Sequence, residues 1–141
     1  MGEAVNQVAF ELPSLPGSLN VLYELNRPDS GLPRKRLKPE WALWVSKMMP
    51  YIPAFRVAEN SVLRVDRCYH LPWFYGNGRW RKVDVVNMDA LLFNVITRKV
   101  GIDDLFVKQG FLDSRDSQAN KVTVVLTEVT EAEWRAVRET A

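Results

Sequence analysis

The chain has 141 residues, of which 47% are hydrophobic and 26% are charged, a balance typical of one globular domain with a single core. No apolar run approaches the roughly 18 residues that cross a bilayer, no basic segment followed by an apolar one opens the sequence, and the single cysteine, Cys68, excludes an internal disulfide and a cysteine-rich zinc site. We therefore expect a cytoplasmic protein without a membrane partner, and the net charge of +2 is too small to indicate nucleic acid by itself.

Basic residues gather in two short stretches of the sequence. Five of them lie between residues 27 and 38, and three more lie between residues 79 and 82, whereas the C-terminal end is rich in glutamate. This asymmetry is typical of a protein with one side facing phosphate groups. Solvated loop residues explain the same composition equally well.

The first half of the chain predicts a strand, a basic loop and a helix. Val8, Phe10 and Leu12 alternate with polar residues, as in an opening strand. A short extended piece over residues 21–25 and a polar loop over residues 26–38 follow. Pro39 suits the first turn of a helix, whose apolar residues recur at helical spacing until prolines end it near residue 50.

The second half predicts three strands and two helices. Alternation predicts a half-buried strand over residues 63–71, and a turn-rich loop over residues 72–82 follows it. A helix begins near Asn87 and ends near Gly101, because apolar residues recur at i, i+3, i+4 and i+7. The remaining elements are a short strand over residues 105–109, a polar loop over residues 113–120 and a closing strand over residues 122–126. A helix from residue 131 onward follows, and it starts with a capping box at Thr130.

This order of elements predicts an α+β fold, a single compact domain over residues 1–141. We expect a mixed or antiparallel sheet flanked by two main helices and a short C-terminal helix.

Carboxylates stand at both ends of the second predicted helix. Asp84 lies just before its start, where backbone N–H groups and the dipole stabilise an anion, and the pair Asp103 and Asp104 follows its end. If the strands that flank this helix are neighbours, Asp84 and Asp104 converge. Clustered carboxylates suit Mg²⁺, which can activate a water and stabilise phosphoryl oxygens. Taken alone, the residues favour the simpler alternative of a helix cap and a turn.

The run KVDVVNMDALLFNVITRKVGIDDLFV resembles the signature segment of the RusA family of Holliday junction resolvases. That signature is a basic residue, then Asp-x-Asp-Asn opening a helix, and an Asp-Asp pair shortly after the helix. Residues 12–23 resemble the N-terminal element of the family, and KVTVVLTEV resembles its closing strand, so that the resemblance spans residues 10–129. It implies a homodimeric, Mg²⁺-dependent endonuclease, with Mn²⁺ as a possible substitute, that cuts Holliday junctions or other branched DNA in recombination and repair.

The resemblance also implies roles for individual residues. Asp84 and Asp104 take the places of catalytic, metal-binding aspartates, Asp103 takes that of the first member of the pair, and Asn87 that of the catalytic asparagine opening the helix. Two positions depart from the family pattern: Val86 replaces its second aspartate and Ala90 replaces its lysine.

These departures leave alternatives open. Asp89 lies three residues after Val86 and is expected to return the missing carboxylate as a metal ligand. If it does not, the chain is a RusA-like protein that binds branched DNA with weak or no cutting. An unrelated α+β interaction protein, whose basic loops are incidental, is the third hypothesis.

The second basic stretch is expected to contact DNA, because interleaved basic and aromatic residues suit phosphate contact and base stacking. Trp73 and Phe74 are instead expected in the local core or a dimer interface. A twofold homodimer would provide the paired cuts that resolve a four-way junction, and the many aromatic residues suit a subunit interface. The DNA contacts expected along the chain are Asn20, Tyr23, Arg34, Lys35, Arg36, Arg79, Trp80, Arg81 and Lys82.

Overall fold

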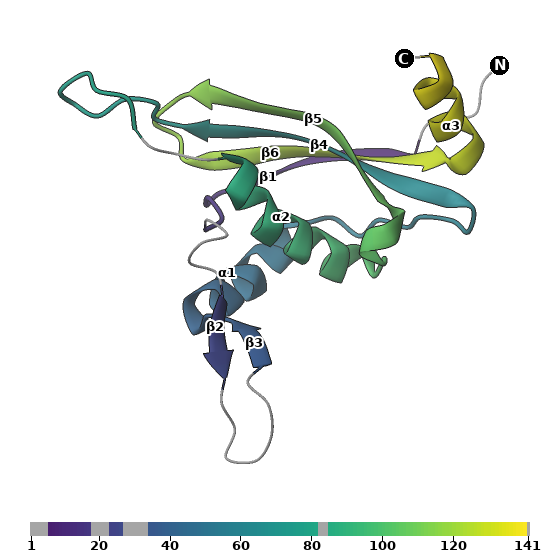
Figure 1. Ribbon diagram of the computed structural model, residues 1–141, viewed down its shortest axis with the longest axis horizontal. Helices are drawn as coiled ribbons and strands as arrows, with labels where there is room; N and C mark the ends of the chain where they lie inside the picture. The colour runs from purple at the N-terminus through teal and green to yellow at the C-terminus, as the bar shows by residue number, and fades with distance from the viewer. Residues whose placement is uncertain (1–5, 18–22, 27–33, 82–84, 141) are drawn as a thin grey trace.

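A four-stranded mixed sheet with two helices packed on one face forms the body of the protein (Figure 1). This computed structural model describes residues 6–17, 23–26, 34–81 and 85–140, and of residues 23–26, 34–37, 87 and 137–140 it describes the backbone alone. The strands of the sheet run in the order β1-β6-β4-β5. Their bounds are Gln7–Leu12 for β1, Ser61–Leu71 for β4, Val107–Asp116 for β5 and Lys121–Thr130 for β6.

Three of the four strands are joined as antiparallel neighbours, and one pair is parallel. β6 lies between β1 and β4 and is antiparallel to both, whereas β4 and β5 are parallel. The alternation predicted for β4 is confirmed, because its core-facing side chains are at most 3% exposed. The α+β class is also confirmed, with a mixed sheet and three α-helices among the described residues.

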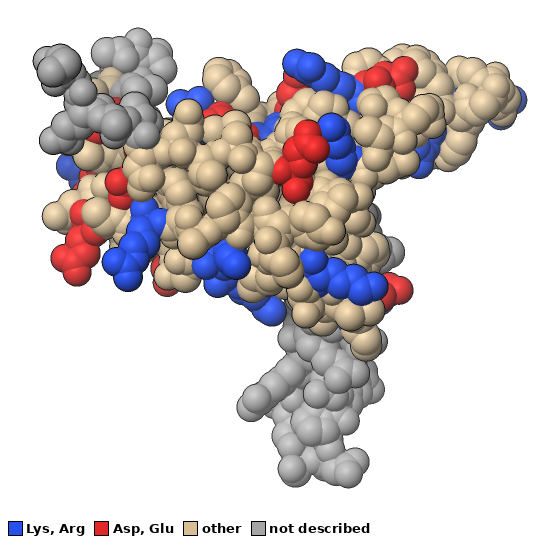
Figure 2. Space-filling view, turned by 180° about the vertical axis from the view of Figure 1, so that it is seen from behind, with Lys and Arg blue, Asp and Glu red and all other residues tan. Residues whose placement is uncertain are grey.

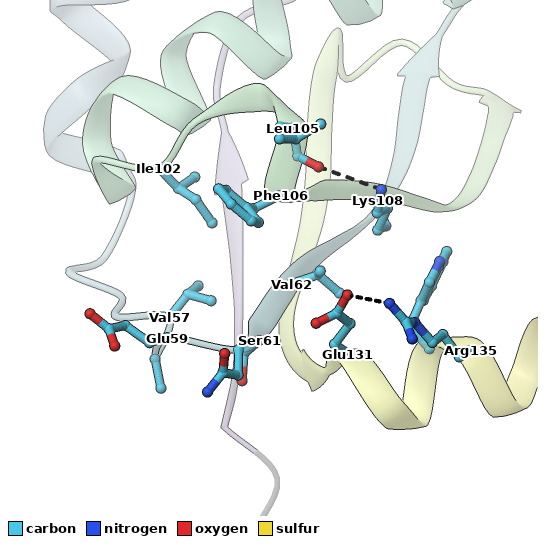
Figure 3. A pocket seen from close by; sticks show the side chains of 13 residues that line it. Val57, Glu59, Ser61, Val62, Ile102, Leu105, Phe106, Lys108, Glu131 and Arg135 are labelled. Carbon is cyan, nitrogen blue, oxygen red and sulfur yellow. Dashed lines mark hydrogen bonds and ion pairs between the residues drawn. The ribbon is translucent and has the colours of Figure 1, made fainter.

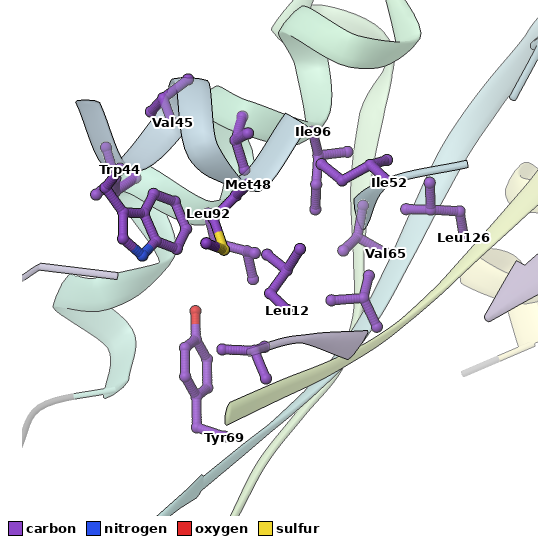
Figure 4. Close-up of a cluster of buried hydrophobic side chains, with 14 of the residues drawn as sticks. Leu12, Trp44, Val45, Met48, Ile52, Val65, Tyr69, Leu92, Ile96 and Leu126 are labelled. Atoms are coloured by element: carbon purple, nitrogen blue, oxygen red, sulfur yellow. The ribbon is translucent and has the colours of Figure 1, made fainter. Parts of the chain in front are cut away.

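Two helices cover the core face of the sheet (Figure 4). The helix α1, Pro39–Met48, begins at its proline and buries Trp44, Val45 and Met48, and the 3₁₀ turn η2, Met49–Tyr51, follows it. The helix α2, Val85–Val100, starts two residues earlier than predicted and buries Leu91, Leu92, Val95 and Ile96 against β4 and β6.

The helix α2 is the crossover between the parallel strands β4 and β5. A parallel connection needs such a crossover, since the chain must return to the starting edge of the sheet. α2 therefore begins at the carboxyl end of β4 and ends near the amino end of β5 (Figure 1). Its 16 residues correspond to a length of roughly 24 Å.

β5 is longer than the sequence predicted. The prediction placed a polar loop over residues 113–120, but residues 113–116 continue the strand and pair with β4 as far as Leu71. The long neighbouring strand supplies backbone partners, so that tertiary pairing overrides a polar local sequence. β5 has an extra residue between Gln109 and Leu112. A Cβ on Gly110, within this stretch, would come within 2.1 Å of the Asp66 carboxylate.

The prediction of a basic loop over residues 26–38, before α1, is wrong for part of that range. Residues Arg34–Leu37 form β3, which pairs antiparallel with β2, Tyr23–Asn26. The hairpin projects from the α1 side of the body, away from the sheet (Figure 1). Local alternation could not predict β3, because its sequence, RKRL, has three basic residues and one apolar one.

The last helix, α3, spans Glu131–Thr140 and confirms the predicted capping box. The Thr130 hydroxyl oxygen accepts a hydrogen bond from the Glu133 N–H at 3.1 Å, and the hydroxyl donates to the Glu133 carboxylate at 2.8 Å. None of the helices that the structure describes is both long and apolar enough to cross a membrane.

Candidate active site

The segment between α2 and β5 turns the Asp103-Asp104 pair back along the helix. Gly101, with φ of +74°, ends α2 in the left-handed conformation. Asp103 then caps the 3₁₀ turn η3, Asp104–Phe106, by accepting a hydrogen bond from the Leu105 N–H at 3.0 Å. The two aspartates therefore differ in their contacts, because the Asp103 carboxylate caps the turn η3 and the Asp104 carboxylate takes no part in that cap.

Asp104 lines a cavity of about 420 Å³ between α2 and β5. Of the described residues that line it, Asp104 alone carries a charge. The others come from one face of α2 and from the start of β5: Ala90, Phe93, Asn94, Thr97, Val107 and Gln109.

Two features of this cavity suit a hard cation. The Oδ1 atom of Asn94 is buried and has no hydrogen-bond partner among the described residues. A buried carbonyl-type oxygen without a partner costs free energy unless a donor or a cation satisfies it. Together with the Asp104 carboxylate it offers two oxygen ligands of the kind that Mg²⁺ prefers. Asn94 was not among the predicted site residues, although it lies one helical turn after Ala90.

Ala90 lines the same cavity as Asp104. It is the position at which the resemblance expects the catalytic lysine. The fold thus brings together two positions of the signature that lie 14 residues apart in the sequence. Helical spacing extends this face by one turn to Val86, whose side chain is 64% exposed.

The expected convergence of Asp84 with Asp104 stays a prediction, because Asp84 lies outside the described residues. The condition for it is met, since β4 and β5 are neighbours. Val85 stands at the start of α2, whereas Asp104 approaches the helix beside Asn94 and Thr97.

Several expected site residues belong to the part of the chain that the structure does not describe. Lys82, Asp84 and Asn20 lie outside the described residues, and so do the side chains of Tyr23, Arg34, Lys35, Arg36 and Asn87. Among the described residues, no three His, Cys, Asp or Glu side chains form a group that could hold a metal ion. The described part of the cavity offers one carboxylate, that of Asp104, and one amide oxygen without a described partner, that of Asn94.

Asp89, which was expected to be a metal ligand, is not among the described residues that line this cavity. Its carboxylate is 11% exposed and accepts hydrogen bonds from the buried Arg67 guanidinium and from the Tyr69 hydroxyl, so that both oxygens are engaged. Burial raises the pKa of the Tyr69 phenol, and the Asp89 charge adds to the increase. Asp89 therefore joins α2 to β4, and its role as a metal ligand stays a prediction.

Arg67 connects this buried cluster to the wall of the Asp104 cavity. Its guanidinium donates to the Gln109 amide oxygen at 3.0 Å and lies 5.1 Å from the centre of the Phe93 ring. Gln109 and Phe93 both line the cavity. Arg67 is thus a positioning residue, and its charge is neutralised by Asp89.

The loop expected to contact DNA is a hairpin at the carboxyl end of β4, and it extends beyond the sheet (Figure 1). Trp80 is 68% exposed. Phe74, which was expected in the local core or a dimer interface, is 39% exposed and lies 4.4 Å from Trp80 between ring centres. On the face shown in Figure 2, described basic and acidic side chains are interspersed rather than gathered in one basic patch.

A larger cavity, of about 730 Å³, lies at the other end of the sheet between α3, η3 and the start of β4 (Figure 3). Its walls are partly apolar, with Ile102, Leu105 and Phe106 opposite the ion pair of Glu131 and Arg135, which is 2.9 Å long. No pattern in the sequence predicted this cavity.

Comparison of the sequence with protein-family models and with curated proteins gives no match.

Proposed function

We propose that this protein is a structure-selective endonuclease of the RusA type, which hydrolyses phosphodiester bonds at Holliday junctions or other branched DNA with Mg²⁺. One observation carries the proposal: Asp104 shares a cavity with Ala90 and Asn94 on one face of α2. The resemblance supplies the chemistry, and the cavity supports it by joining the helix and the Asp-Asp pair in one place.

In this proposal Asp104 and Asn94 offer oxygen ligands to the metal, and Asp84 adds a second carboxylate. The metal, when bound, supplies an activated water and stabilises the charge on the phosphoryl oxygens. The described residues bind and orient: Gln109 and Phe93, held by Arg67, shape the wall against which the phosphate lies. Ala90 brings no positive charge, so we expect slower cutting than a lysine at this position would give.

The direct test is a labelled four-way junction incubated with Mg²⁺, with Mn²⁺ and with a chelator. We expect cleavage that needs the metal and spares a linear duplex of the same sequence. The wild-type chain is compared with Asp104→Asn to exclude a contaminating nuclease. Equal cleavage by both proteins, or cleavage that persists with the chelator, would contradict the proposal.

A second candidate function is binding of branched DNA with little or no cutting. It is favoured by Ala90 in the cavity and by Val86 on the exposed surface of α2, where the family pattern has a lysine and an aspartate. Salt-sensitive binding of the junction without metal-dependent cleavage would select this function.

A further inference from the structure

The segment from Pro72 to Arg81 is an ordered hairpin. The Arg81 N–H donates to the Trp73 carbonyl at 2.7 Å, and the Tyr75 N–H donates to the Arg79 carbonyl at 2.8 Å. The tip is closed by a bond from the Gly78 N–H to the Tyr75 carbonyl at 2.9 Å, and Gly78 has a φ of +84°, which favours glycine. A preformed hairpin loses little conformational entropy when it binds a partner.

This hairpin exposes aromatic rings to solvent. Trp80 lies beside Phe74 and Trp73, with ring centres 4.4 and 6.5 Å apart, yet it remains 68% exposed, and Tyr75 remains 54% exposed. Exposed aromatic side chains that gather in one place mark a binding surface more often than single exposed ones do.

The charges of the hairpin are all positive. Between residues 72 and 81 the only charged side chains are those of Arg79 and Arg81. Arg81 supports the hairpin, because its guanidinium donates to the Pro72 carbonyl at 3.1 Å and lies 5.9 Å from the centre of the Tyr75 ring. Arg79 is exposed and directly precedes Trp80 in the sequence.

A cavity of about 300 Å³ connects the hairpin to the start of α2. It is lined by Leu71, Trp73, Trp80, Arg81, Val85 and Ser114. Its size is at the lower end of small-ligand sites, which span roughly 300–1,000 Å³. An aromatic wall with an arginine beside it suits a flat ring attached to a phosphate.

We propose that this hairpin binds an unpaired nucleobase at the branch point of its DNA substrate, with the base stacked on Trp80 and the adjoining phosphate beside Arg79. Stacking on an aromatic side chain accepts any base, and arginine contacts the backbone, so the pair recognises single-stranded nucleic acid without reading its sequence. The inference rests on the proposed function and narrows its substrate to branches with exposed bases. An acidic protein surface would match the arginines but not a stacking platform.

The experiment measures binding by fluorescence anisotropy in a chelator, where cutting cannot occur. The probes are a four-way junction with unpaired bases at its centre, a single-stranded oligonucleotide and a blunt duplex. Trp80→Ala is expected to weaken binding of the first two probes by about 5- to 100-fold and of the duplex by much less. Trp80→Phe retains most of the affinity, and Tyr51→Ala, at an aromatic residue that is 52% exposed elsewhere, serves as the matched control.

Arg79→Ala provides a second measurement. It is expected to weaken all three probes alike and to lower the salt dependence by about one ion. Because Trp80 and Arg79 are exposed, thermal melts of these variants should match that of the wild type.

Equal losses on all probes for Trp80→Ala, or no loss on any, would overturn the stacking site while leaving the nuclease intact. Binding to anionic lipid vesicles is measured for the same variants. If Trp80→Ala loses vesicle binding but keeps DNA binding, the stacking site is overturned in favour of a membrane contact. Wild-type protein that binds no DNA would overturn both this inference and the proposed function.

Discussion

Asp104 is the carboxylate on which the proposed chemistry depends most directly. We expect Asp104→Asn to abolish metal-dependent cleavage and to leave junction binding unchanged or tighter, because the substitution removes a ligand charge and also a repulsion toward phosphate. Asp84→Asn should behave alike. Cleavage of the labelled junction and its binding in a chelator are measured side by side.

The matched control is Asp113→Asn, which changes an exposed carboxylate in β5, on the sheet face opposite the core. Normal Mg²⁺-dependent cutting by Asp104→Asn would remove Asp104 from the site.

Val86 is the position at which the family pattern can be restored with least risk to the fold. Its side chain is 64% exposed in the first turn of α2, so that an aspartate there would remain solvated and would be stabilised by the helix dipole. We expect Val86→Asp to raise metal affinity or the rate of cutting. Metal titration of the cleavage rate checks this, and an unchanged titration curve would show that the site needs no carboxylate at this position.

Tyr69 gives the protein a pH dependence of known sign. Burial, and next the Asp89 charge, raise the pKa of its phenol above the ordinary value of about 10. Above that pH the unfolded chain loses a proton that the folded chain keeps, so the free energy of unfolding falls as pH rises, by about 1.4 kcal/mol per pH unit. The Tyr69→Phe variant has no phenol at this position, so its free energy of unfolding lacks this dependence on pH.

Urea unfolding of both proteins over the range from about pH 8 to pH 11 measures this difference. The stability of the wild type should approach that of Tyr69→Phe as the pH rises, and parallel curves would show that Tyr69 is not linked to folding.

The docking of α2 onto β4 depends on the buried pair of Arg67 and Asp89. Replacing one partner of a buried ion pair leaves the other without compensation, which typically costs about 3–5 kcal/mol. We therefore expect Asp89→Ala to lower the free energy of unfolding by that amount. If Asp89 were a metal ligand instead, the same substitution would lower metal affinity with little loss of stability.

Chemical denaturation together with metal titration separates the two roles of Asp89. The surface pair of Arg135 and Glu131, which is mostly exposed, is the matched comparison, because Glu131→Ala should cost no more than about 1 kcal/mol.

The elements that sequence patterns predicted best are those with strong local signals. α1 begins at Pro39, α3 begins after the Thr130 capping box, and β4 follows its alternating residues. Each of these signals acts within a few residues, so that neighbours in the sequence determine the outcome.

The elements that were missed depend on partners far away in the sequence. β3 has a basic sequence and is held by pairing with β2, and the second half of β5 is polar and is held by pairing with β4. A strand that is held by backbone pairing in this way need not show the alternation of apolar and polar residues from which strands are predicted.

The candidate site was predictable only in part, for the same reason. The signature segment directed attention to Asp104, yet Asn94 and Gln109 joined the site through the packing of η3 and β5 against α2. The role of Asp89 as a metal ligand stays a prediction. Helical spacing places Asp89 near Val86, whereas in the structure its carboxylate is paired with the buried Arg67 of β4. A charge partner 22 residues away cannot be recognised from the spacing of residues along one helix.

Cutting a four-way junction on opposing strands needs two active sites related by a twofold axis, which a homodimer supplies. β5 is an edge strand among the described strands, and Leu105, Phe106 and Phe111 on or before it are 71%, 47% and 75% exposed. Exposed apolar side chains at a strand edge are typical of a surface that pairs with another chain. A twofold axis beside β5 would also place the two Asp104 cavities near each other, since Val107 and Gln109 line them.

We therefore expect light scattering at micromolar concentration to give about twice the 16.2 kDa mass of one chain. The double variant Leu105→Glu, Phe111→Glu should shift the mass to that of the monomer and slow paired cutting, because charged side chains oppose burial of this surface. Leu43→Glu, which changes a 54% exposed residue on α1, should leave the dimer intact. A mass near 16.2 kDa for the wild type, with and without junction DNA, would contradict the dimer, and a dimer that survives the double variant would place its interface elsewhere.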